Sequence, residues 1–319
     1  MRNRRKPLFV ACFALVLAVA AIAQNRRRPG YGGNGWGDHG IVYTEWPNSV
    51  PVDVDTVRTA REIAAHSTDT PMWTNTPGFE NDVFTFVRII YRRGTYNSSS
   101  PWGWITDFPD SDLNLSYRLQ QVTSMRTSPE GRVLRLTDPA LFDFPWIYMV
   151  EPGGLTLKDD EVPILRKYLL NGGVLWADDF WGTVQWDNFE HEIKRALPEA
   201  ERSFVELEMN HEIFHTVFDL RVPKNKLQTP NIGQGIRSLN PGSYDYGVTW
   251  ENHDGEACKD MHVRAIFDEK GRIMVLATHN CDNGDGWERE GADEGFFHEF
   301  SERRAYPLGV NVMFYLMTH

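Results

Sequence analysis

The middle of the chain contains one unit that constrains the fold more than any other segment. Residues 147–150 form a short apolar run typical of a buried strand, and residues 174–177 form a second one. Between them, Val162, Leu165 and Leu169 recur at the spacing that places them on one face of a helix. Two strands joined through a helix in this way pair in parallel, with a right-handed crossover. The unit therefore predicts a parallel sheet with helices packed against it.

The segments on either side continue this alternation. Residues 83–91 are predicted to form a strand. Asp110 is an eligible first residue for the helix that follows, where Leu115 and Leu119 share a face. A further helix is predicted over residues 189–197. The alternation of strands and helices thus extends beyond the central unit in both directions.

The last third of the chain has a different pattern. Residues 263–267 and 273–278 flank a turn-rich spacer, which predicts a β-hairpin. Val310, Phe314 and Met317 share one face of a predicted C-terminal helix. We therefore expect an α/β fold, a three-layer sandwich whose sheet is mainly parallel with some antiparallel strands.

The start of the chain has the pattern of a secretory signal peptide. A basic beginning is followed by an almost wholly apolar run, and Ala21, Ile22 and Ala23 fit the small-x-small cleavage rule. We predict a signal peptide over residues 1–23 and a periplasmic or secreted product. Contact with a membrane is expected only if this segment stays uncleaved as an anchor.

Three further segments complete the predicted organisation. Residues 24–40 are rich in glycine and lack an apolar face, so they are predicted to be a flexible leader. Residues 41–78 are interpreted as an N-terminal extension, with a strand over 41–43 and a helix over 55–66. The α/β domain is predicted to occupy residues 79–319.

The charge of the chain excludes one class of partner. The 319 residues have a formal charge of -11, and the loss of residues 1–23, with four bases and no acid, would leave 29 basic and 44 acidic residues. Such a surface repels phosphate backbones, so we expect no nucleic-acid partner. Hydrophobic residues make up 41% of the chain, which is enough for the core of a folded soluble protein.

Two cysteines, Cys258 and Cys281, lie beyond the predicted cleavage site. An oxidising compartment would allow them to form a disulfide. Two separate buried thiols are the alternative, and the sequence leaves the choice open.

Polar or aromatic residues follow three of the predicted strands at the points where the strands end. They are Glu151, Asp178, Asp179, Trp181, His279 and Asn280. Ligands of open α/β sheets bind beyond the carboxyl ends of the strands, so these residues predict one shared cleft. Within it, Asp179 is a candidate base and His279 its partner, because burial and neighbouring charges separate pKa values. The alternative is that the acids cap neighbouring segments and bind backbone amides.

A second acidic group follows a pair of tryptophans, Trp102 and Trp104. Asp110 and Asp112 favour the N-terminus of the predicted helix electrostatically, whereas Asp107 is not explained in this way. An aromatic face beside a carboxylate suits a polyhydroxylated ring, so a carbohydrate is a candidate ligand for Trp104 and Asp107. The alternative is that the tryptophans belong to the core.

Two segments have the composition of metal sites. His211-Glu-Ile-Phe-His215 satisfies the two-histidine spacing of zinc hydrolases, which makes a metal-dependent hydrolase an alternative function. The competing interpretation is a pair of polar turn residues, because the long helix and third ligand of such enzymes are not apparent. Residues 282–286 are rich in oxygen ligands, as calcium loops are, and an acidic turn is the competing interpretation. The sequence does not identify a cofactor.

Six sequence blocks together resemble one bacterial family. They are FVRIIY (86–91), DFPDSDLNL (107–115), YMVEPG (148–153), LLNGG (169–173), DDFWG (178–182) and PNIG (230–233). From about residue 81 to the end, the chain resembles the domain of unknown function numbered 4159 (DUF4159). That family is similar to the class I glutamine amidotransferase-like superfamily, which implies a flavodoxin-like sandwich. Its relatives are often associated with the cell envelope.

The chain departs from the amidotransferases at the position of their nucleophile. Neither 151–154 nor 178–182 contains a cysteine, so glutamine hydrolysis by that route is excluded. We therefore expect an exported protein whose α/β domain binds a small polar ligand, with a carbohydrate as a candidate, in an acidic and aromatic cleft. Whether it also catalyses a hydrolysis is open. The alternative is a noncatalytic scaffold or interaction protein of the cell envelope.

Overall fold

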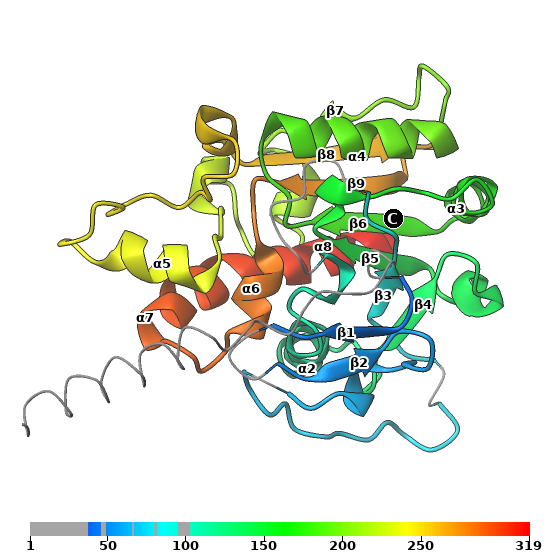
Figure 1. Ribbon diagram of the computed structural model, residues 1–319, viewed down its shortest axis with the longest axis horizontal. Coiled ribbons are helices and arrows are strands. Elements are labelled where there is room, and N and C mark those ends of the chain that lie inside the picture. The colour runs from blue at the N-terminus through cyan, green and yellow to red at the C-terminus, as the bar shows by residue number, and fades with distance from the viewer. Residues whose placement is uncertain (1–37, 46–48, 66, 80–81, 95–102) are drawn as a thin grey trace, which may run out of the picture. The chain divides into compact units, whose positions relative to one another are not determined.

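A seven-stranded mixed β-sheet forms the centre of the computed structural model (Figure 1). Residues 38–45, 49–65, 67–79, 82–94 and 103–319 are described, so the predicted signal peptide and most of the leader lie outside the described residues. All described residues belong to the unit Gly35–His319. The strands of the sheet are β3 (Val87–Ile90), β4 (Arg132–Arg135), β5 (Trp146–Val150), β6 (Val174–Asp178), β7 (Val205–Glu206), β8 (His262–Phe267) and β9 (Ile273–His279).

The order of the strands is β4-β3-β5-β6-β9-β8-β7. The first five strands in this order are parallel, and β8 and β7 pair antiparallel at the far edge. The predicted mainly parallel sheet and the predicted hairpin, which is β8–β9, are confirmed.

The central strand-helix-strand unit is also confirmed. α3 (Glu161–Leu170) connects β5 to β6, which pair in parallel along their whole length, with Tyr148 opposite Trp176. Gly172 has a φ of 106°, a conformation that costs little only for glycine, and the following N–H of Gly173 bonds back to Tyr168 O. The glycine pair therefore ends the helix and turns the chain into β6.

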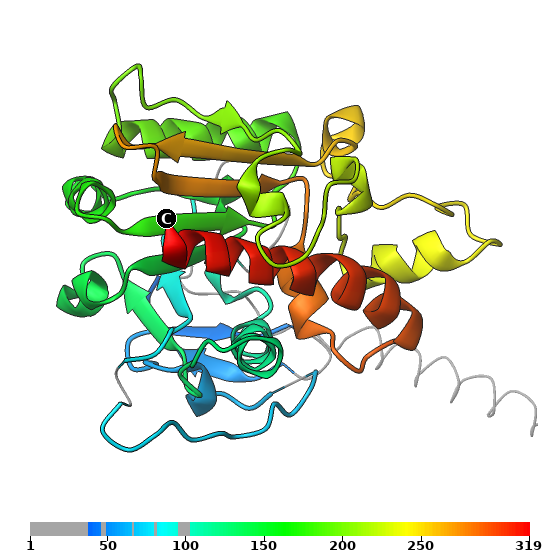
Figure 2. The same cartoon turned by 180° about the vertical axis from the view of Figure 1, so that it is seen from behind.

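Helices cover both faces of the sheet. Ile147 and Met149 belong to one hydrophobic core with α3 and α4 (Gly182–Ala196), whereas Trp146 and Tyr148 belong to a second core with α2 (Asp110–Val122) and α8 (Tyr306–Thr318). Figure 2 shows α8 crossing one face of the sheet. β5 is apolar throughout because both of its faces are buried. The result is a three-layer α/β arrangement.

The last third of the chain contains helices that the sequence pattern did not predict. They are α5 (Ile232–Leu239), α6 (Asn283–Glu288), α7 (Glu294–Phe296) and the π-helix η8 (Phe297–Ala305). The expected acidic turn over residues 282–286 is wrong, because these residues begin α6. Asp282 caps this helix by accepting a hydrogen bond from Asp285 N at 2.7 Å. Gly286 packs closely on Ala305, and such packing outweighs the low helix propensity of glycine.

The N-terminal extension pairs β1 (Ile41–Tyr43) with β2 (Pro51–Asp53) in an antiparallel two-stranded sheet. The strand over 41–43 is confirmed, but the helix over 55–66 is wrong, since it is replaced by the short 3-10 helix η1 (Ala60–Glu62). The backbone there bonds to the edge of the sheet instead. Val133 N donates to Arg58 O, and Ala60 N donates to Glu130 O, each at 2.9 Å.

Cys258 and Cys281 are buried free thiols, so the alternative of two separate thiols holds and they do not form a disulfide. Within the described ranges, no helix has the length and the apolar composition needed to cross a membrane.

Candidate functional site

Four left-handed residues mark the carboxyl edge of the sheet. Among the described residues, Asp107, Glu151, Asp179 and Asn280 are the non-glycine residues with positive φ, between 50° and 62°. The last three follow directly after β5, β6 and β9. Positive φ is sterically costly for a residue with a Cβ, and such residues gather at functional sites. The sequence predicted all four as site residues.

Three aspartates from separate segments meet at this edge. Asp107, Asp179 and Asp282 each place one carboxylate oxygen within 4.8 Å of the other two. Their exposed fractions are 1%, 7% and 3%. Asp107 lies just before α2, Asp179 directly follows β6, and Asp282 is the N-cap of α6. We call these three residues the aspartate triad.

Few groups compensate the charge of the triad. Asp179 Oδ1 accepts a hydrogen bond from Trp181 Nε1 at 2.8 Å, and Asp282 Oδ1 accepts the bond from Asp285 N. Asp107 Oδ2 is buried and has no hydrogen-bond partner in the described part of the chain. The ion pairs formed among the described residues include none of the three carboxylates.

Burial raises the pKa of all three triad carboxyls well above the usual range of aspartate. Repulsion between acids adds to this effect. Asp107 is repelled most by Glu45, Asp179 by Glu251, and Asp282 by Asp179. A cation at this position would stabilise the ionised carboxylates, whereas a proton is the alternative when none binds.

A second carboxylate group lies beside the triad and shares Asp107 with it. Glu45, Asp107 and Glu288 each place one oxygen within 4.8 Å of the others. Arg289 lies 2.6 Å from Glu45 Oε2, 2.6 Å from Glu288 Oε2 and 2.8 Å from Asp285 Oδ1. Burial still raises the pKa of Glu45 to about 7, although Arg289 opposes the shift. One guanidinium therefore serves three carboxylates.

Two more glutamates flank the triad. Glu151 Oε2 accepts a hydrogen bond from Gly103 N at 2.8 Å. Glu251 accepts one from Asn231 N at 2.8 Å and pairs with His253 Nε2 at 2.9 Å. After burial, the charges of Glu251 and Glu151 are the main causes that raise the pKa of Asp179. The predicted site residue Glu151 thus shares the electrostatic environment of the triad.

Asp178 and Asn280 hold the edge together through internal bonds. Asp178 is fully buried and accepts hydrogen bonds from Tyr148 Oη at 3.0 Å, Asn283 N at 3.0 Å and Gly284 N at 3.2 Å. It therefore anchors the start of α6. Asn280 Oδ1 accepts from Gly182 N at 2.8 Å, which fixes the start of α4. Both predicted ligand-binding side chains already have protein partners.

His279 does not act on Asp179 in this structure. Its Nε2 lies 2.9 Å from Gly182 O and its Nδ1 lies 3.4 Å from Arg264 Nη1. The ring packs against Phe180 and Trp186. Burial lowers the pKa of His279 to about 3, so the imidazole is neutral at physiological pH and is a weak base. The predicted pairing of Asp179 with His279 is replaced by the bond from Trp181.

Both predicted aromatic residues of the cleft are buried. Trp104 is 1% exposed and lies on α2's N-terminal side, with its ring against Phe108. Trp181 is 2% exposed, donates to Asp179, and stacks on His253 at 6.1 Å between ring centroids. Trp181 therefore contacts the triad through Asp179, whereas Trp104 belongs to the hydrophobic core. Trp102 lies outside the described residues.

His211 and His215 lie on either side of the 3-10 helix η5 (Glu212–Phe214). His211 Nδ1 accepts a hydrogen bond from Ile213 N at 3.3 Å, and His215 Nε2 lies 3.3 Å from Asn210 O. The two-histidine spacing therefore occurs on a short turn and not on a long helix. In the part of the chain that the structure describes, the groups able to hold a metal ion consist of carboxylates and do not include these histidines.

The sequence did not indicate three acids of the site, Glu45, Glu251 and Glu288. They lie in segments without a motif, and only tertiary packing brings them to the sheet edge. Asp282 and Asp285 belong to the oxygen-rich segment 282–286, whose composition indicated a metal site but not its place at this edge.

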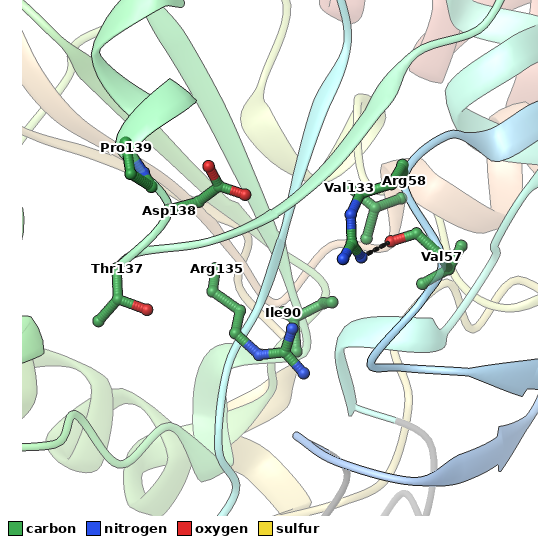
Figure 3. Close-up of a pocket in the computed structure, with 8 residues that line it drawn as sticks. All are labelled: Val57, Arg58, Ile90, Val133, Arg135, Thr137, Asp138 and Pro139. Carbon is green, nitrogen blue, oxygen red and sulfur yellow. Dashed lines mark hydrogen bonds between the residues drawn. The ribbon is translucent and has the colours of Figure 1, made fainter.

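The cavity shown in Figure 3 does not contain these acids. It has a volume of about 170 Å³ and is lined by Val57, Arg58, Ile90, Val133, Arg135, Thr137, Asp138 and Pro139. Arg58 Nη1 donates to Val57 O at 2.7 Å, which is the dashed line in Figure 3, and Arg135 Nη2 pairs with Asp55 Oδ1 at 3.0 Å. Its two guanidinium groups therefore bind oxygens of the N-terminal extension.

The fold and the site define an α/β domain with buried carboxylates at the carboxyl edge of a mainly parallel sheet. Residues 85–317 match the family described as a domain of unknown function, DUF4159, and the chain belongs to this family. The resemblance seen in the sequence blocks is thereby confirmed at the level of the family. A comparison with curated proteins gives no match.

Proposed function

We propose that the α/β domain binds a small polar ligand that carries positive charge at the carboxyl edge of its sheet. One observation carries this proposal, namely the gathering of eight buried or half-buried carboxylates in one electrostatic cluster. They are Glu45, Asp107, Glu151, Asp179, Glu251, Asp282, Asp285 and Glu288.

The cluster is costly for the protein when no cation is bound. An ionised carboxylate loses favourable hydration on burial and is repelled by its neighbours, which Arg289 offsets on one side of the cluster only. Three of these acids, Asp107, Glu151 and Asp179, also have a positive φ, which is a strained backbone conformation for a residue with a Cβ. A ligand with a metal ion or an ammonium group would offset these costs and would bind the folded state selectively.

A neutral carbohydrate has less support than a cationic ligand. The stacking partner predicted for a sugar, Trp104, is buried together with Trp181, and each ring contacts protein groups. Sugar hydroxyls can bond carboxylates, but they bring no positive charge. Neutral and amino sugars therefore form a matched pair of probes, because they differ mainly in charge.

Thermal unfolding of the purified full-length chain in metal-free buffer tests the proposal. The probes are calcium chloride, spermidine, glucosamine and glucose. A ligand present at 100 times its dissociation constant adds about 2.7 kcal/mol to the stability of the folded state. We expect at least one cationic probe to raise the unfolding temperature and glucose to leave it unchanged.

Two variants show whether a shift arises at this site. Asp179→Asn should reduce the shift, since asparagine keeps the left-handed backbone accessible but removes the charge. Asp187→Asn, at an exposed position of α4, removes the same charge elsewhere and should leave the shift intact. If no cationic probe stabilises the chain, the proposal is wrong and the noncatalytic envelope scaffold is favoured.

We further propose that the protein is exported and that its fold is related to the class I glutamine amidotransferase-like, flavodoxin-like sandwiches. The N-terminal sequence supports the first point, and the strand-helix-strand unit in a mainly parallel sheet supports the second. Mass spectrometry of the periplasmic and culture fractions tests export. A mature chain beginning near residue 24 is expected, and an uncleaved chain in the cytoplasmic fraction would contradict it.

A further inference from the structure

We infer that the aspartate triad is a binding site for one divalent metal ion, with Asp107, Asp179 and Asp282 as its carboxylate ligands. This inference rests on the proposed function and deepens it, because it names the chemical class of the positive charge. The ion belongs to the hard, oxygen-preferring class that includes calcium, magnesium and manganese.

The spacing of the three carboxylates fits a single ion. Oxygen ligands lie about 2.3–2.6 Å from calcium, so two ligands of one ion are at most about 5 Å apart. The triad oxygens all lie within 4.8 Å of one another. Three carboxylates supply part of the coordination shell, and water or a bound ligand would supply the rest, as is usual for these ions.

Asp107 provides an independent indication of a ligand. Its side chain is 1% exposed, yet its Oδ2 has no hydrogen-bond partner among the described residues. A buried carboxylate oxygen without a partner is rare in folded proteins, since its desolvation is not repaid. Asp107 is also the residue common to both carboxylate groups.

The structure favours the triad over the second carboxylate group. In the group of Glu45, Asp107 and Glu288, two of the three acids already pair with Arg289 at 2.6 Å. A metal ion there would have to displace or approach a fixed guanidinium. The triad has no such pair in the part of the chain described, so a cation would not compete with a bound guanidinium there.

The surrounding bonds hold the ligands in place before any ion binds. Trp181 Nε1 orients Asp179, and the cap bond from Asp285 N orients Asp282. Asp178 fixes the start of α6 through Asn283 N. Such supporting contacts are typical of metal sites, where they orient the ligands. Neither a histidine nor a cysteine belongs to the triad, so zinc and copper are less suited to it.

Isothermal titration of the metal-stripped full-length chain with calcium, magnesium and manganese chlorides tests the site. We expect saturable binding of one ion per chain. Manganese also gives an electron paramagnetic resonance signal whose free fraction falls on binding. Spermidine, which carries positive charge but cannot accept carboxylate ligands into a coordination shell, is the matched probe.

Two variants test the ligands by different routes. Asp282→Asn removes one charged ligand but keeps the helix cap, because asparagine caps as well as aspartate. Gly284→Ala keeps every charge, but the new Cβ would lie 2.0 Å from Asp107 Oδ2 and must displace that carboxylate. Alanine favours the helix, so this chain should still fold. Each change should weaken binding by about 10-fold or more, whereas Asp187→Asn should not.

The outcomes separate this inference from the proposed function. Metal binding that Asp282→Asn and Gly284→Ala each weaken supports the metal site and the proposed function. Stabilisation by spermidine or glucosamine without metal binding overturns the metal site but leaves the proposed function standing. Metal binding that neither variant alters places the ion elsewhere and overturns the triad as its site. No binding of any cation overturns both conclusions.

Discussion

Two buried aspartates five residues apart have opposite surroundings. Asp112 lies on α2 and pairs with the fully buried guanidinium of Arg88, which it contacts at 2.5 Å. The third guanidinium nitrogen of Arg88, Nη1, donates to Trp104 O at 2.8 Å and to Thr106 O at 2.7 Å. Asp107, just before the same helix, has a buried oxygen with no hydrogen-bond partner in the described part of the chain.

The difference between the two aspartates separates structural charge from functional charge. The charges of Asp112 and Arg88 compensate each other, and their polar atoms are bonded, so this pair fixes the position of α2 beneath the sheet. Asp107 forms no ion pair among the described residues, and the charges of Arg88 and Arg289 offset its burial only in part. Burial of a charged side chain therefore does not by itself indicate a functional site. The absence of a charge partner for that side chain is the feature that indicates one.

The largest expected effect on stability comes from breaking the ion pair between Arg88 and Asp112. Arg88→Met should lower the free energy of unfolding by about 3–5 kcal/mol, because it leaves Asp112 as an unpaired buried charge. Urea unfolding monitored by circular dichroism measures the loss. The exposed neighbour Arg92 provides a control, since Arg92→Met should change the stability little. An equal loss in both variants would contradict the assigned role of Arg88.

The pH dependence of stability should report the raised pKa of Glu45, in the carboxylate group that Arg289 compensates only in part. Glu45 has an ordinary pKa of 4.5 when unfolded and about 7 when folded, so between these values the folded state retains a proton that the unfolded state has lost. Stability is therefore fully present below pH 4.5 and is lost as the pH rises through 7. The loss is at most about 3 kcal/mol for this group.

Urea unfolding of the metal-free chain between pH 5 and pH 8 measures this loss. Addition of calcium at pH 8 should reverse it, if the inferred metal site is correct. A calcium-free chain that becomes more stable from pH 5 to pH 8 would show that the cluster is compensated after all.

The same substitution should have opposite signs at the two aspartates. Asp107→Asn removes a repelled, uncompensated charge and should raise the stability of the metal-free chain at pH 8 by about 1 kcal/mol. Asp112→Asn should lower the stability, because Arg88 loses its counterion. Chemical denaturation of the two variants under identical conditions gives both values, and a loss in each would remove the distinction between the two sites.

The smallest effect is expected at a supporting bond. Trp181→Phe removes the hydrogen bond that Asp179 accepts and leaves most of the aromatic packing in place. We expect a loss of about 1 kcal/mol or less in the free energy of unfolding, together with weaker cation binding. Calorimetric titration of this variant measures the second effect. Unchanged affinity would mean that the indole does not position Asp179.

Much of the fold follows from the sequence because it depends on local patterns. The apolar runs of β5 and β6 and the spacing of Leu165 and Leu169 report burial directly. The helix predicted after Asp55 failed because backbone groups there bond to the distant β4, which local spacing does not record. α6 was missed because its two glycines are tolerated only through tertiary packing.

The site was predicted in part for the same reason. Glu151 and Asp179 could be placed because they follow predicted strands at the sheet edge, whereas Asp107 was a candidate only as a carboxylate beside Trp104, with no indication that it joins them. Glu45 and Glu288 could not, since neither belongs to a recognisable motif. His279 was given the wrong partner because strand order indicates proximity, whereas the packing of its ring against Phe180 decides its direction.

The ion pair between Glu45 and Arg289 joins residues 244 positions apart. A chain made from its N-terminus can pair β3, β5 and β6 before α6 and Arg289 have been synthesised. During that period Asp107 and Asp179 remain solvated and their repulsion is weak. Loop-closure entropy also delays contacts between distant segments. The acidic edge is therefore completed only after α6 has been made, and its electrostatic cost falls on a late docking step of folding.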